Sequence, residues 1–148
     1  MFLFPTKKEK PAKQEEGPLG VTAAPKEQEQ LPTVIQGRPV GSKEEARVAI
    51  GLEVVGWRYI YQKAYYGGSG TPGGIVVDFL VLTPGLMTPL LVQSRYWHTI
   101  RSRESKDFYQ ISRLSKIPNL AQPIEIWDYE LQTIQATISL LRQRLGSG

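Results

Sequence analysis

The sequence predicts an α/β domain that follows a long N-terminal arm. Residues 1–40 hold six of the eleven prolines and no aromatic residue after Phe4. A segment of this composition cannot bury enough apolar surface to offset its ordering entropy. From residue 41 onward, helical and strand periodicities alternate in the order helix, three strands, helix, strand, helix. This alternation is typical of a small α/β fold.

We therefore divide the chain into a disordered or extended arm, residues 1–40, and an α/β domain, residues 41–148. The opening MFLFPTKKEK puts a short apolar part before the lysines, which is the wrong order for a signal peptide. No apolar run approaches the roughly 18 residues that span a bilayer, so no membrane contact is expected. We expect a cytoplasmic (host-cell or intracellular) location. The arm either remains a tail or becomes ordered on a protein partner, with MFLF as its anchor.

The composition limits the chemistry that the chain can perform. It has no cysteine and one histidine, which excludes disulfides and argues against a zinc site. The net charge of +4 is unevenly distributed, because residues 95–116 hold six basic side chains against Glu104 and Asp107. Such a patch fits a polyanion partner, although solvated basic faces are also common.

The first predicted helix begins with a capping box, with Ser42 as N-cap and Glu45 three residues later. Apolar residues at Val48, Leu52 and Val55 then share one helical face. We expect this helix to end near Gly56.

Three strands are expected next. WRYIYQKAYY (57–66) is rich in aromatic and branched residues, IVVDFLVL (75–82) is typical of a buried strand, and LLVQ (90–93) is the third. The glycine-rich GGSGTPGG joins the first two as a hairpin loop, and TPGLMTP turns the chain between the second and the third.

The C-terminal part should supply two helices and a strand. Residues 99–115 predict a helix with a basic outer face, and QPIEIW (122–127) a short strand. DYELQTIQATISLLRQRL (128–145) predicts a closing helix capped by Asp128. Arginines occupy its last turn, where the helix dipole favours them.

Asp78 interrupts an otherwise apolar strand, where an ionised carboxylate is costly without a cation or hydrogen-bond donors. Its side chain either lies on an exposed face or at a loop, or it binds a metal ion. If the Asp78 strand pairs with LLVQ, then Val92 and Gln93 come close to it. A carboxylate, a backbone carbonyl and water suit a hard divalent cation such as Mg²⁺. Such a cation stabilises charge on phosphoryl oxygens.

Two further residues are candidates for the same chemistry. His98, with an ordinary pKa near 6.5, is able to deprotonate an attacking water. Its alternative is an imidazole that is hydrogen-bonded at the domain edge. Glu45 is explained by its capping role, and it is also a candidate to contact the metal or a metal-bound water. Glu44 is a weaker candidate for the same place.

A helix with Glu45, then VVDFLV, then LLVQSRYWH, then a basic helix resembles the PD-(D/E)xK endonuclease-like core. Within that superfamily, VQSRYWH is most similar to the very-short-patch mismatch repair endonucleases. The resemblance covers roughly residues 42–145, and its specific part is Asp78 and about seven residues around Trp97. It implies a restriction-endonuclease-like αβββαβα core and a DNA endonuclease that uses Mg²⁺ or Mn²⁺.

The resemblance also implies individual roles. Asp78 matches the metal-binding aspartate of the family, and the backbone carbonyl of Val92 matches the second protein ligand. His98 matches the histidine that activates water. Tyr96 and Trp97 match aromatic positions that enter the DNA stack, and their alternative role is to pack the closing helix onto the sheet.

The basic residues after the third strand are expected to contact DNA phosphates: Arg95, Arg101, Arg103 and Lys106. The chain departs from the family at Gln93-Ser94-Arg95, where the wider superfamily has Glu-x-Lys. Glutamine offers an oxygen without charge, and arginine neither gives nor takes a proton at neutral pH. In the repair enzymes the Gln93 position is a histidine, and nearby cysteines hold a zinc ion that this chain cannot bind.

Two functions follow from these observations, and we favour the first. One is a metal-dependent DNA endonuclease of nicking or repair and recombination type, which would act as a homodimer to cut both strands of a duplex. The other is a catalytically degenerate module of the same fold, acting in DNA binding or in an assembly through its N-terminal arm.

Overall fold

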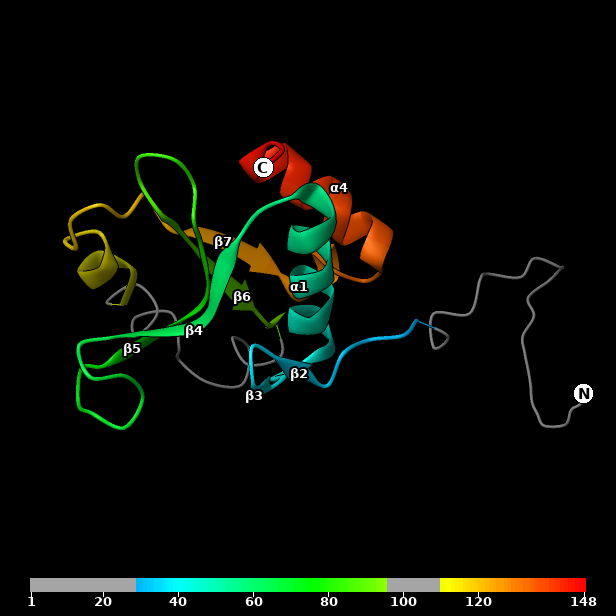
Figure 1. Cartoon of the computed structure of the whole chain (residues 1–148). Helices are drawn as coiled ribbons and strands as arrows, with labels where there is room; N and C mark the ends of the chain where they lie inside the picture. Colours follow the sequence, from blue (N-terminus) through cyan, green and yellow to red (C-terminus); the bar gives the residue numbers. More distant parts are fainter. Residues whose placement is uncertain (1–28, 96–109) are drawn as a thin grey trace, which may run out of the picture. The chain divides into compact units, whose positions relative to one another are not determined.

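The computed structural model of the chain describes residues 29–95 and 110–148 (Figure 1). Two short strands come first, β2 (Val34–Ile35) and β3 (Arg38–Pro39). The main elements are then α1 (Lys43–Val55), β4 (Tyr59–Tyr65), β5 (Ile75–Val81), β6 (Thr88–Gln93), β7 (Ile124–Trp127), a 3-10 turn η3 (Asp128–Glu130) and α4 (Ile134–Leu145). The predicted α/β class is confirmed.

The four longer strands form one mixed sheet in the order β4-β5-β6-β7. β4, β5 and β6 pair antiparallel, and β7 pairs parallel to β6. A parallel pair requires a long crossover connection. Residues 110–114 of that connection are helical, and the rest of the helix expected over residues 99–115 lies outside the described residues.

The ends of the helices test the capping predictions. Ser42 is the N-cap of α1, its Oγ accepts from the Glu45 amide at 3.1 Å, and the helix ends at Gly56 with φ +100°. The N-cap and the end of the helix are confirmed, but the second half of the expected capping box is not formed, because the Glu45 carboxylate accepts from Tyr61 Oη instead of the Ser42 amide. The predicted cap of the closing helix is wrong, because α4 begins after Thr133, whose Oγ1 accepts from the Ala136 amide at 3.0 Å. Asp128 begins the separate turn η3.

Buried apolar side chains form two clusters. The main core packs α1 and α4 against the sheet, and it includes Val48, Leu52, Tyr61, Phe79, Leu90 and Leu141. The second core is smaller and consists of Ile75, Val77, Leu91 and Leu114. In Figure 1, α1 and α4 lie on one side of the sheet and residues 110–114 on the other. Strand β5 therefore contributes Val77 to the second core and Phe79 to the main core, and Asp78 lies at the boundary between them.

Close packing of α1 on α4 depends on Gly51. A Cβ at this position would lie 2.7 Å from Leu141 Cδ1 and 3.3 Å from Thr137 Cγ2. Buried Arg47 also fixes α1, because its Nη1 donates to the Leu131 carbonyl at 2.9 Å, just before α4. The two helices are thereby held as one layer.

The described fold includes residues that the sequence assigned to the arm. The β2–β3 hairpin contributes Ile35 to the main core, where the side chain is 4% exposed. The Gln36 amide donates to the Tyr59 carbonyl and accepts from the Tyr61 amide, both at 2.8 Å. The compact unit runs from Leu31 to Gly148, so it begins earlier than residue 41. Within the described residues, no helix is long and apolar enough to cross a membrane.

Candidate metal and nucleic-acid site

Strands β5 and β6 separate at Asp78. Their pairing covers Phe79 with Leu90 and continues only toward the β5–β6 turn, whereas β6 stays paired with β7 as far as Gln93. In the gap, Asp78 Oδ2 accepts from the Val92 amide at 2.8 Å. A side chain therefore takes the place of a bond between the strands.

The same contact orients the Val92 carbonyl. In a strand, the N–H and C=O of one residue point toward the same neighbouring strand. Since the Val92 N–H points to Asp78, its carbonyl also lies on the edge that faces β5. A carboxylate and a carbonyl thus lie on the two sides of the gap.

A second carboxylate approaches from α1. Tyr61 Oη donates to Glu45 Oε1 and accepts from the Gly41 amide at 3.2 Å. The Tyr61 ring is buried against Phe79, with centroids 5.1 Å apart. The Glu45 carboxylate is therefore turned toward β4 by a rigid phenol, while only the Glu45 amide serves the Ser42 cap.

The pKa of Asp78 reflects its surroundings, including the Glu45 carboxylate. The pKa of Asp78 is raised from 3.8 to about 7, chiefly by burial; the hydrogen bond from the Val92 amide lowers it, and the nearby Glu45 carboxylate raises it. The pKa of Tyr61 is raised to about 12, first by burial and then by its hydrogen bond to Glu45. Two carboxylates thus lie near each other where solvent is partly excluded, and this arrangement favours a bound proton or cation.

The donor set suits a magnesium-like ion better than a transition metal. Among the described residues, no group of three or more His, Cys, Asp and Glu side chains comes together. Mg²⁺ is usually held by one or two carboxylates while it keeps several waters. Asp78, Glu45 and the Val92 carbonyl match that requirement.

Arg95 contacts the segment that follows β7. Its amide donates to Asp128 Oδ2 at 3.3 Å, and its Nε is 3.6 Å from Asp128 Oδ1. Its guanidinium carbon lies 4.9 Å from the centre of the Tyr129 ring, which stacks on Trp127. The residue expected to contact phosphate therefore also anchors the turn after β7.

The remaining predicted site residues are distributed as follows. Gln93 ends β6, half-buried and next to Val92. Glu44 Oε2 lies 3.8 Å from Arg47 Nη1 on the same helix, α1. The other members of the predicted set lie outside the described residues: Tyr96, Trp97, His98, Arg101, Arg103 and Lys106.

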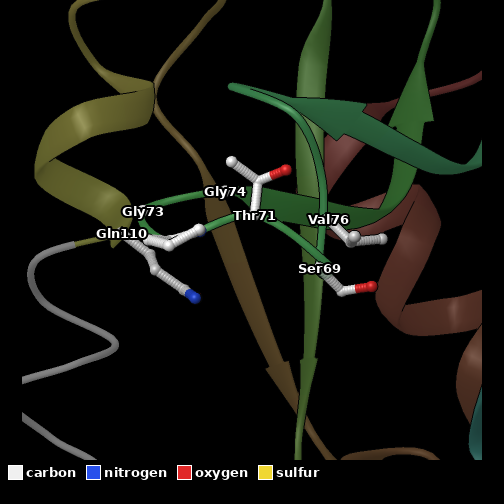
Figure 2. A pocket seen from close by; sticks show the side chains of 7 residues that line it. Ser69, Thr71, Gly73, Gly74, Val76 and Gln110 are labelled. Atoms are coloured by element: carbon white, nitrogen blue, oxygen red, sulfur yellow. The ribbon is translucent and has the colours of Figure 1, made fainter.

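A pocket of about 460 Å³ lies beside the glycine-rich β4–β5 loop. Figure 2 shows Ser69 and Thr71 on the loop and Gln110 on the neighbouring helical segment. Arg113 supports the loop, since its Nη1 donates to the Gly73 carbonyl and its guanidinium carbon lies 3.9 Å above the Tyr66 ring. The pocket is lined by Ser69, Thr71, Pro72, Gly73, Gly74, Val76 and Gln110.

Comparison with known proteins finds no matching family model, no matching curated protein and no matching solved structure. The functional argument therefore depends on the chain's own geometry. Sequence reasoning missed Tyr61, because an aromatic residue in a strand usually indicates only a core position. It also missed the partner of Arg95, because an Asp ahead of a helical pattern is typical of a cap.

Proposed function

We propose that this protein is a metal-dependent DNA endonuclease with a restriction-endonuclease-like core of the PD-(D/E)xK kind. The observation that carries the proposal is the half-buried Asp78 carboxylate at the separation of β5 and β6, which accepts from the Val92 amide and feels the charge of Glu45. Two such carboxylates repel each other unless a proton or a cation is shared. A divalent cation that also binds a phosphate would satisfy both.

The order of the elements supports the same proposal. A helix bearing Glu45, three antiparallel strands, a parallel fourth strand and a closing helix agree with the αβββαβα arrangement. The aspartate lies on the second of these strands, and its partner Val92 on the third. This is the placement that the resemblance implies for the metal-binding groups.

Each residue has a defined role in the proposal. Asp78 and the Val92 carbonyl hold Mg²⁺ or Mn²⁺, and Tyr61 keeps the Glu45 carboxylate directed at the same place. The bound ion supplies stabilisation of the charge that develops on phosphoryl oxygens. His98 takes the proton of the attacking water. Gln93 contributes a neutral oxygen at the end of β6.

DNA contacts come from the segment after β6. Tyr96 and Trp97 meet the bases, and the phosphates are held by Arg95, Arg101, Arg103 and Lys106. Cutting both strands of a duplex would require two copies of the chain.

The test is incubation of the full chain with supercoiled plasmid in Mg²⁺, in Mn²⁺ and in EDTA. We expect metal-dependent nicking that is lost in Asp78→Asn and in His98→Ala. Glu53→Gln is the matched control, because Glu53 also accepts from a tyrosine, Tyr59, at 3.0 Å, but on the exposed side of α1. It should nick like the parent. Nicking by Asp78→Asn at the parental rate would refute the assignment.

A second candidate is favoured by one observation. Arg95, which stands where the superfamily has lysine, is engaged by Asp128 and Tyr129, and Gln93 carries no charge. The chain would then keep the fold for DNA binding or for an assembly through its arm. Plasmid that remains intact with either metal but shifts on a gel would support this alternative.

A further inference from the structure

Gln62 is the residue of β4 that lies opposite Asp78. The ladder pairs Tyr61 with Phe79 and Lys63 with Val77, which leaves Gln62 and Asp78 as the position between them. These two residues do not pair, although the ladder continues on both sides. The interruption of the β4–β5 ladder thus coincides with the carboxylate of the proposed metal site.

The backbone of Gln62 is left-handed, with φ +55° in the middle of a strand. A long side chain is seldom found in this region of φ and ψ, and glycine adopts it without steric cost. Such conformations persist where the surrounding structure imposes them, and they cluster at functional sites.

Three other left-handed residues with a side chain are described. Asn119, with φ +69°, lies in a turn, and the other two use their side chains to hold the fold. Gln36, with φ +50°, bonds the backbone of β4 through both ends of its amide. Tyr66, with φ +54°, donates its hydroxyl to the Arg113 carbonyl at 3.3 Å and lies under that guanidinium. In both of these cases the side chain makes a contact that stabilises the fold.

Gln62 makes no such contact. Its side chain is half-buried, and its amide has no hydrogen-bond partner among the described residues, 29–95 and 110–148. A bend of β4 between the two cores accounts for the left-handed backbone, but glycine would make that bend with less strain. The bend therefore explains the backbone, but it does not explain why a glutamine stands at this position instead of a glycine.

We propose that Gln62 is a further ligand of the site, with its amide oxygen binding the divalent cation held at Asp78. The inference rests on the proposed metal site and extends it by one residue. Amide oxygens are suitable donors for hard cations. The Gln62 oxygen would add a neutral donor from β4 to the donors of β5 and β6, without adding to the repulsion between Asp78 and Glu45.

The experiment is a calorimetric titration of the full chain with Mn²⁺, which gives a Kd for each variant. Gln62→Gly keeps the left-handed backbone and removes the side chain with its amide, so we expect Mn²⁺ to bind about tenfold more weakly or worse. The melting temperature without metal should stay the same or rise. Gln62→Glu has the same length and a charged oxygen, and it should bind Mn²⁺ more tightly than the parent.

Gln36→Gly is the matched control, because it removes the same amide at another left-handed position. It should lower the melting temperature and leave the Kd unchanged. Asp78→Asn provides the reference for loss of the site.

Each outcome decides between the two proposals. If Asp78→Asn loses Mn²⁺ while Gln62→Gly keeps the parental Kd, Gln62 serves only the bend, and the metal site stands without it. If the parent itself binds no Mn²⁺, the metal site and the Gln62 ligand are both refuted. Should Gln62→Gly fail to fold, a Gln62→Glu variant with unchanged or weaker affinity would equally overturn the inference.

Discussion

Replacing Asp78 with asparagine should stabilise the metal-free protein at alkaline pH. The native carboxylate has its pKa raised from 3.8 to about 7, mainly by burial. Asparagine is nearly isosteric, and its side-chain oxygen can still accept from the Val92 amide, which the native Oδ2 does at 2.8 Å. The variant therefore removes a buried charge and keeps the local hydrogen bond.

The sign and size follow from proton linkage. Between about pH 4 and pH 7, native Asp78 holds a proton that the unfolded chain has lost, so the free energy of unfolding falls as pH rises through this window. Each pH unit is worth about 1.4 kcal/mol. Above pH 7 the ionised Asp78 therefore lowers the free energy of unfolding by on the order of 4 kcal/mol. Near pH 4 this loss is small.

The assay is urea unfolding of parent and Asp78→Asn in EDTA at pH 5 and at pH 8. Comparing the two proteins cancels the groups that titrate independently of Asp78. We expect the advantage of the variant to grow by about 2–3 kcal/mol between the two pH values. Glu53→Gln, a substitution at an exposed position of α1, should differ from the parent in free energy of unfolding by nearly the same amount at both pH values. If the difference in free energy of unfolding between the parent and Asp78→Asn is the same at pH 5 and at pH 8, Asp78 does not hold a proton in the native state. The electrostatic argument then fails.

Three more predictions concern the metal site, the Tyr61 hydroxyl and the packing of α1 on α4. Mn²⁺ at about 100 times its Kd should stabilise the parent by about 2.7 kcal/mol at pH 8 and should leave Asp78→Asn unchanged; equal melting shifts in a thermal scan would contradict the site. Tyr61→Phe should lower the free energy of unfolding by about 1–3 kcal/mol in urea, because it leaves Glu45 without its phenol donor; it should also weaken Mn²⁺ binding, and an unchanged Kd would show that Glu45 is not needed. Gly51→Ala should destabilise by about 1–2 kcal/mol despite the better helix propensity of alanine, since the new Cβ lies 2.7 Å from Leu141 Cδ1; combining it with Leu141→Val should recover part of the loss, and additive losses would contradict the clash.

The sequence by itself determined the helix limits and the order of the strands where the information is local. Ser42 and Gly56 bound α1 because an N-cap hydroxyl and a left-handed glycine satisfy groups within one turn of the chain. Asp78 was identifiable as costly from its apolar neighbours alone. The same local reasoning failed at Asp128, whose actual partners, Ser94 and Arg95, lie far from it in the sequence.

Only the tertiary structure decided how the candidate site is assembled. Glu45 meets Tyr61 through the packing of α1 on the sheet, and Asp78 meets Val92 because β5 and β6 stop pairing. Neither event leaves a periodic pattern in the chain. The left-handed Gln62 is equally invisible in the sequence, since its conformation follows from the passage of β4 between two cores. Register and strand separation depend on contacts between distant segments, and these fix where the polar side chains converge.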